Sequence, residues 1–159
     1  MYTILLLTED TLTARDATRI ASLHENETVQ AHVLVPADTK HNRLVEALDE
    51  VALGKLRQAL DDSDDATPEQ AEQEAMLAVN ATIGVLRGVG IEAQGSVTGD
   101  DPVPAAVEAA GRHGVDEVVV VTHPHIVKEA LHRDWSWRLR DGLDLPLLHF
   151  VAGTDRVVG

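Results

Sequence analysis

Four consecutive valines, Val118–Val121, are the feature that most constrains the fold of this chain. A short run of β-branched residues without polar alternation is typical of a strand buried on both faces, and such strands belong to parallel sheets covered by helices. Open parallel sheets bind their ligands just outside the carboxyl ends of the strands. The valine run ends in Thr122-His123-Pro124-His125, so these residues mark the expected ligand site.

Along the rest of the chain, apolar segments typical of strands alternate with segments that have helical spacing, and together they indicate five strands and five helices. The strands are expected at residues 2–7, 29–35, 91–98, 115–121 and 145–151, and the helices at 12–24, 43–60, 67–88 or 90, 103–113 and 126–140. Strands that alternate with helices at this spacing predict right-handed crossovers and a parallel sheet with helices on both faces. The fold class is therefore α/β.

The length and composition of the chain limit the number of domains and the classes of partner that we expect. We expect one domain over residues 1–152, with an acidic linker at 61–66 between the two middle helices and a tail at 153–159. The chain has no cysteine, which excludes disulfides and thiolate zinc sites, and its formal net charge of −14 disfavours nucleic acid and anionic membranes as partners. No apolar run approaches the roughly 20 residues that cross a bilayer, so a cytoplasmic protein is expected.

Several segments resemble the universal stress protein family over residues 2–152. They are Ala31–Pro36, Gly90-Ile91-Glu92-Ala93, Gly99-Asp100-Asp101-Pro102, Gly114–Val120 and Leu145-Pro146-Leu147-Leu148. The resemblance implies a flavodoxin-like, adenine nucleotide alpha hydrolase-like three-layer sandwich with strand order 3-2-1-4-5. It also implies a role in stress response and a homodimer formed through the last strand, with Leu145, Leu147 and Phe150 at the interface.

The ATP-binding members of that family carry Gly-x2-Gly-x9-Gly-Ser/Thr after strand four. The corresponding positions here are Val121, Pro124, Asp134 and Trp135, and none of them matches. A proline donates no N–H, an aspartate repels phosphate, and the backbone of bulky residues cannot approach a triphosphate as glycine does. We therefore expect no ATP site and no other cofactor.

Three histidines near the expected cleft suggest a different ligand. His123, His125 and His132 are candidate ligands for a divalent transition metal such as zinc, nickel or copper, because neutral imidazoles suit these ions. The alternative is that these histidines only stabilise a turn or face solvent. The candidate ligand-binding residues around the cleft are Thr8, Glu9, Val35, Thr122, His123 and His125.

Three functions follow from these features, and the sequence leaves them open. The first is a regulatory module of the stress-protein type that is neither catalytic nor ATP-binding. The second is a protein that binds a small ligand or a metal through the histidines after strand four. The third is an enzyme that uses one of those histidines as its base, although no Gly-x-Ser-x-Gly nucleophile motif occurs.

Overall fold

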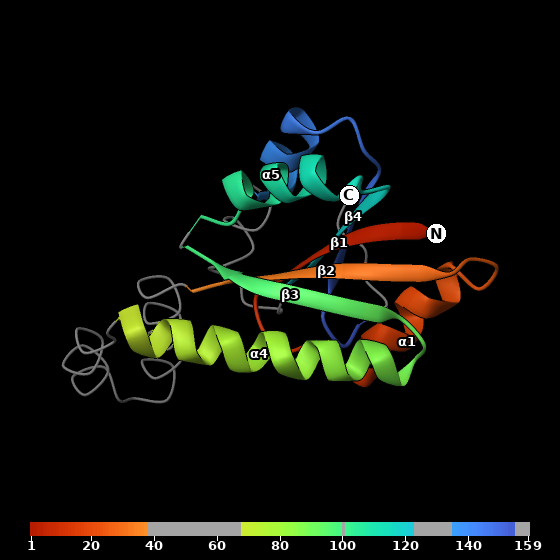
Figure 1. Ribbon diagram of the computed structural model, residues 1–159, viewed down its shortest axis with the longest axis horizontal. Coiled ribbons are helices and arrows are strands. Elements are labelled where there is room, and N and C mark those ends of the chain that lie inside the picture. The colour runs from red at the N-terminus through yellow and green to blue at the C-terminus, as the bar shows by residue number, and fades with distance from the viewer. Residues whose placement is uncertain (38–67, 100, 123–134, 155–159) are drawn as a thin grey trace.

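A computed structural model describes residues 1–37, 68–99, 101–122 and 135–154, and it contains one five-stranded sheet (Figure 1). The strands are β1 (Tyr2–Thr8), β2 (Val29–Pro36), β3 (Glu92–Thr98), β4 (Glu117–Thr122) and β5 (Leu147–Val151). All four strand pairs are parallel, and the order is β3-β2-β1-β4-β5. The predicted α/β class and the predicted strand order are both confirmed.

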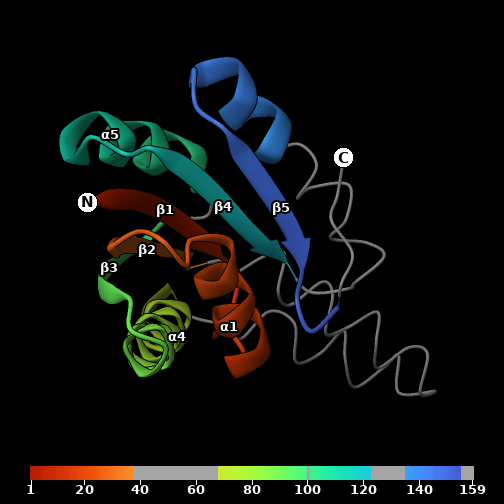
Figure 2. The same cartoon turned by 90° about the vertical axis from the view of Figure 1, so that its right-hand side faces the viewer.

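Helices cover both faces of this sheet (Figure 2). Helices α1 (Ala14–Leu23) and α4 (Pro68–Gly88) lie on one face, while α5 (Val103–His113) and the helical residues 135–142 lie on the other. The strands supply alternate side chains to two separate cores. Ile4, Leu6 and Val121 join the core under α1 and α4, whereas Leu5, Leu7 and Val120 join the core under α5.

Local signals in the sequence explain where α1 and α5 begin and end. Thr13 caps α1, because its hydroxyl accepts a hydrogen bond from the Asp16 amide and donates one to the Asp16 carboxylate. The Asp101 carboxylate accepts from the Val103 amide at the start of α5. Gly114 ends α5 with φ = 61°, a left-handed conformation that glycine adopts without strain.

The structure places the start of one helix and of one strand at other residues than the sequence predicted. Helix α1 begins two residues after the predicted Leu12, whose amide instead donates to the Thr82 hydroxyl of α4. Strand β5 begins at Leu147, after Pro146, because proline has no N–H to donate to the sheet. The predicted helix at 43–60, the linker at 61–66 and the first part of the predicted helix at 126–140 lie outside the described residues.

The last strand forms one edge of the sheet, as the dimer prediction assumed, but the side chain of Phe150 on this strand is buried. Its side chain is 1% exposed and packs in the core under α1, where the Arg19 guanidinium lies 4.3 Å from the ring centre. Side chains alternate between the two faces of a strand, so Leu147 and Phe150, three residues apart, point in opposite directions. The Phe150 side chain is therefore not exposed for contact with a second copy, and the dimer through β5 stays a prediction.

Candidate functional site

The strand order places the switch point of the sheet, where the connections reverse direction, at the carboxyl ends of β1 and β4. The connections from β1 to β2 and from β2 to β3 step in one direction, whereas the chain returns across the sheet to reach β4. This change of direction makes the β1–β4 boundary the usual ligand position in such sheets. Thr8 of β1 is paired with Val121 of β4 here, and the Glu9 amide donates to the Val121 carbonyl at 3.4 Å.

Three of the four described candidate residues turn their side chains into the protein. Thr8, Val35 and Thr122 are each buried, and the Thr8 hydroxyl donates to the Asp10 carbonyl at 2.6 Å. Glu9 is the fourth of these residues. It is partly exposed, and it also interacts with other residues of the protein. Any contact that a ligand makes at Thr8, Val35 or Thr122 would therefore involve the main chain.

The predicted metal ligands His123, His125 and His132 lie outside the described residues. Within the described part of the chain, no group of three or more histidine, aspartate or glutamate side chains is placed to hold a metal ion. The same part also contains no helix with the length and apolar character needed to cross a bilayer. The metal site stays a prediction.

A buried histidine that the sequence analysis missed lies on β5, next to β4. His149 of β5 places Nε2 at 2.8 Å from the Thr122 hydroxyl and Nδ1 at 2.9 Å from the Ser136 hydroxyl. All three residues are at most 4% exposed. The signal was present, because His149 is the polar residue inside the apolar strand Leu147–Val151, and a buried imidazole requires polar partners.

This Thr122–His149–Ser136 network joins β4, β5 and the helical residues 135–142. A neutral imidazole has one donor and one acceptor nitrogen, so it satisfies both hydroxyls in either of two directions. The Ser136–His149 distance suits a nucleophile and its base, but the third member is a hydroxyl where nucleophilic triads have a carboxylate. Since Ser136 is also buried, the network holds the structure together and does not present a nucleophile to a substrate.

Two described residues stand at positions of the ATP-binding motif, and both are packed. Val121, at the first glycine position, belongs to the core under α1 and α4. Trp135, at the serine or threonine position, is 9% exposed and belongs to the core under α5 together with Leu139. The neighbouring Ser136 directs its hydroxyl to His149, so it is committed to the buried network.

The C-terminal end of β5 is held against α1 by a buried carboxylate. Asp16 is fully buried, and its Oδ2 accepts from the Gly153 amide at 2.9 Å. Arg15 and Arg19 donate to the carbonyls of Gly153 and Thr154. These contacts fix the chain directly beyond β5, although the Asp16 Oδ1 atom has no hydrogen-bond partner among the described residues.

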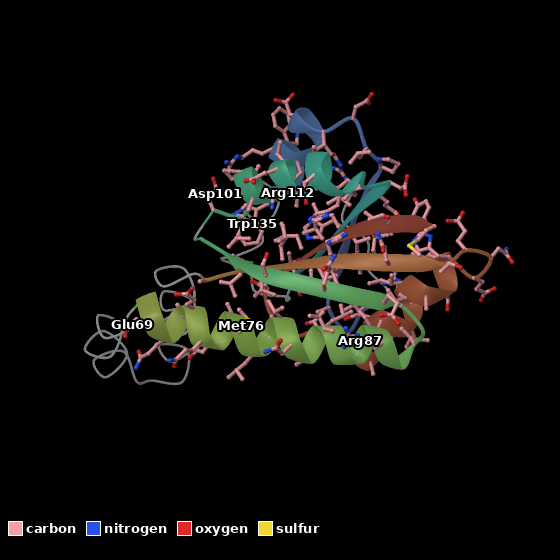
Figure 3. All side chains as sticks on the ribbon, in the orientation of Figure 1. Glu69, Met76, Arg87, Asp101, Arg112 and Trp135 are labelled. Atoms are coloured by element: carbon pink, nitrogen blue, oxygen red, sulfur yellow. The ribbon has the colours of Figure 1, made fainter. Side chains whose placement is uncertain are left out.

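A polar groove of about 270 Å³ lies on a different part of the molecule, over β2 and β3 beside α5. It arises from the topology, because right-handed crossovers place α1 and α4 together on the opposite face. Among the described elements, only α5 flanks β2 and β3 on this side. The polar residues along the groove are His32, Gln94, Ser96, Thr98, Glu108, Arg112 and His113 (Arg112 is labelled in Figure 3).

The sequence carried a signal for this groove that our reading of the strands did not use. In β3, polar residues alternate with Ala93, Gly95 and Val97, which is the pattern of a strand covered on one face only. Those polar residues are Glu92, Gln94, Ser96 and Thr98. The alternation thus distinguishes β3 from the fully buried β4.

Comparisons with known proteins agree with the fold and add no family assignment. No protein-family model matches the chain, and a search of curated proteins finds no match. Among solved structures, the fold is similar to that of the hypothetical protein MJ0577, whose biochemical function was assigned from its structure. The TM-score is 0.57 and the sequence identity 18%, over 96% of this chain and 97% of that one. The chain therefore shares the α/β fold of that protein at distant sequence identity.

Proposed function

We propose that this protein is a regulatory module of the universal stress protein type that neither binds ATP nor catalyses a reaction. The observation that carries the proposal is the packing of Trp135 in the core under α5, at a motif position where ATP-binding members need a small hydroxyl residue. Val121 supports the same conclusion, since a buried valine replaces a glycine whose backbone would approach the phosphates.

The buried network around His149 supports a non-catalytic role. General bases and nucleophiles must reach their substrate within hydrogen-bond distance. Neither Ser136 nor His149 is accessible in the described structure, and both are engaged with each other. The fold alone is compatible with many activities, so this argument rests on the site and not on the architecture.

Calorimetric titration with magnesium and ATP tests the absence of an ATP site. We expect no saturable heat at protein concentrations of tens of micromolar. A dissociation constant at or below about 10 μM, which corresponds to about −7 kcal/mol, would contradict the proposal. The control variant is Trp137→Ala, which removes a tryptophan two positions from Trp135 whose side chain is 71% exposed. If this variant gained ATP binding, Trp137 and not Trp135 would be the obstacle, and our reasoning would be wrong.

We also propose a two-fold homodimer formed through the β5 edge. The exposed edge of a parallel sheet offers unpaired backbone groups to a second copy, and Leu145 and Leu147 remain partly exposed there. Light scattering should give twice the chain mass at micromolar concentration. Leu147→Lys should shift the protein toward the monomer, whereas Leu77→Lys, on the exposed side of α4, should not. A monomeric wild-type protein would exclude this interface.

A further inference from the structure

Two histidine rings join the C-terminal end of α5 to the sheet. His32 of β2 and His113, the last residue of α5, stack with ring centres 3.8 Å apart and ring planes at 16°. His32 is 6% exposed, and both residues line the groove over β2 and β3. The stack is therefore a contact between the last turn of α5 and the floor of the groove.

The hydrogen bond to Gln94 favours a neutral His32 ring in the native structure. The Gln94 amide nitrogen lies 3.2 Å from His32 Nδ1. An amide nitrogen only donates, so Nδ1 must accept, and the neutral ring carries its proton on Nε2. Protonation of His32 would place a hydrogen on Nδ1 that faces the Gln94 N–H groups. The native arrangement thus requires neutral His32 unless the amide turns over.

The charged groups around His32 would do little to stabilise a positive charge on its ring when His113 is also protonated. On α5, Arg112 forms an ion pair with Glu108, four residues earlier. A second small cavity beside His32 contains Arg87 of α4 and Glu92 of β3, one charge of each sign. His113 is then the group that meets His32 directly, and two stacked imidazolium rings repel each other at this distance.

We propose that the His32–His113 stack is a pH-sensitive latch that holds the last turn of α5 against β2 and opens this end of the groove on acidification. Burial, followed by the charge of His113, lowers the pKa of His32 from the ordinary value of 6.5. A histidine whose pKa is lowered by folding stabilises the native state above about pH 6.5. This stabilisation is lost as the pH falls through the lowered value, so the latch opens below pH 6.5.

Hydrogen exchange measured between pH 7.5 and pH 5 tests the latch. The readout is the exchange rate of the amides at residues 110–114, corrected for the intrinsic effect of pH. If opening takes up one proton, the rate should rise by up to about tenfold per pH unit between about pH 6.5 and the lowered pKa of His32, and it should level off below that pKa. Amides in the middle of α4 serve as an internal control, because a general loss of stability would accelerate them equally.

Two variants separate the latch from other effects of acid. His32→Phe keeps an aromatic ring but removes the buried titrating group, and it should abolish the local pH dependence. His113→Phe keeps an aromatic ring against His32 but removes the positive charge that His113 can carry. The pKa of His32, followed by NMR, should therefore be higher in this variant than in the wild type. The proposal is overturned if His32→Phe and the wild-type protein show the same pH dependence at residues 110–114, or if the His32 titration is unchanged in His113→Phe.

Discussion

Replacing Gly95 by alanine should destabilise the protein, whereas the same replacement at Gly84 should stabilise it. Gly95 lies in β3, and α4 packs along this strand at the edge of the sheet (Figure 1). A Cβ atom at Gly95 would lie 2.7 Å from the Val33 carbonyl oxygen and 2.9 Å from both Val33 Cβ and Val79 Cγ1. Two of these atoms belong to or adjoin the backbone of β2, so the strands or α4 must move.

The magnitude follows from two opposing terms. Overpacking a well-packed site by one methyl group costs about 1–3 kcal/mol, and the loss of glycine flexibility in the unfolded chain offsets about 0.4–1 kcal/mol of it. The net destabilisation at Gly95 should be about 1–2 kcal/mol. A chain of this size loses about 2–4 °C in Tm per kcal/mol, so Tm should fall by about 2–8 °C.

Gly84 is the matched control because it undergoes the same chemical change in open space. It lies inside α4, and apart from the nearby backbone of α4 itself, a Cβ at this position would meet no atom of the described residues within 4 Å. Alanine is preferred to glycine in a helix interior by about 0.5–1 kcal/mol, so Gly84→Ala should be more stable than the wild type by that amount. Urea denaturation followed by circular dichroism measures both free energies of unfolding. The reasoning is refuted if Gly95→Ala is as stable as the wild type.

Two further predictions concern the helical residues 135–142. Trp135→Ala should cost about 3–5 kcal/mol of stability because it leaves a cavity in the core, whereas Trp137→Ala should change stability by less than about 0.5 kcal/mol; equal effects in thermal melts would contradict the assigned burial. The Arg138 guanidinium donates two hydrogen bonds to the Asp101 carboxylate, at 2.7 and 3.1 Å, and lowers the pKa of that carboxyl. This partly exposed pair should contribute about 0.2–1 kcal/mol at pH 7. Because the folded pKa lies below the ordinary value, the contribution is present above about pH 4 and is lost as the pH falls through the lowered value. The free energies of wild type and Asp101→Asn should therefore converge in acid, and a constant difference down to pH 2 would argue against the ion pair.

The sequence by itself determined the class of fold and the two helix ends of α5. The valine run of β4 and the alternation of strands and helices depend on local backbone preference and burial, which a linear pattern records. Likewise, Asp101 and Gly114 act on neighbouring residues, so their roles are visible from spacing alone. The strand order came from the resemblance to a family and was confirmed by the sheet.

Only the tertiary structure decided which side chains meet across the sheet. The packing of a helix on β4 and β5 brings His149 and Ser136 to Thr122. In the same way, His113 contacts His32, which lies 81 positions earlier in the sequence. Periodicity assigns a residue to a face but does not choose its partner on that face. The burial of Phe150 illustrates the same limit, because the edge position of β5 was predictable, whereas the cover that α1 and Arg19 provide depends on contacts between distant segments.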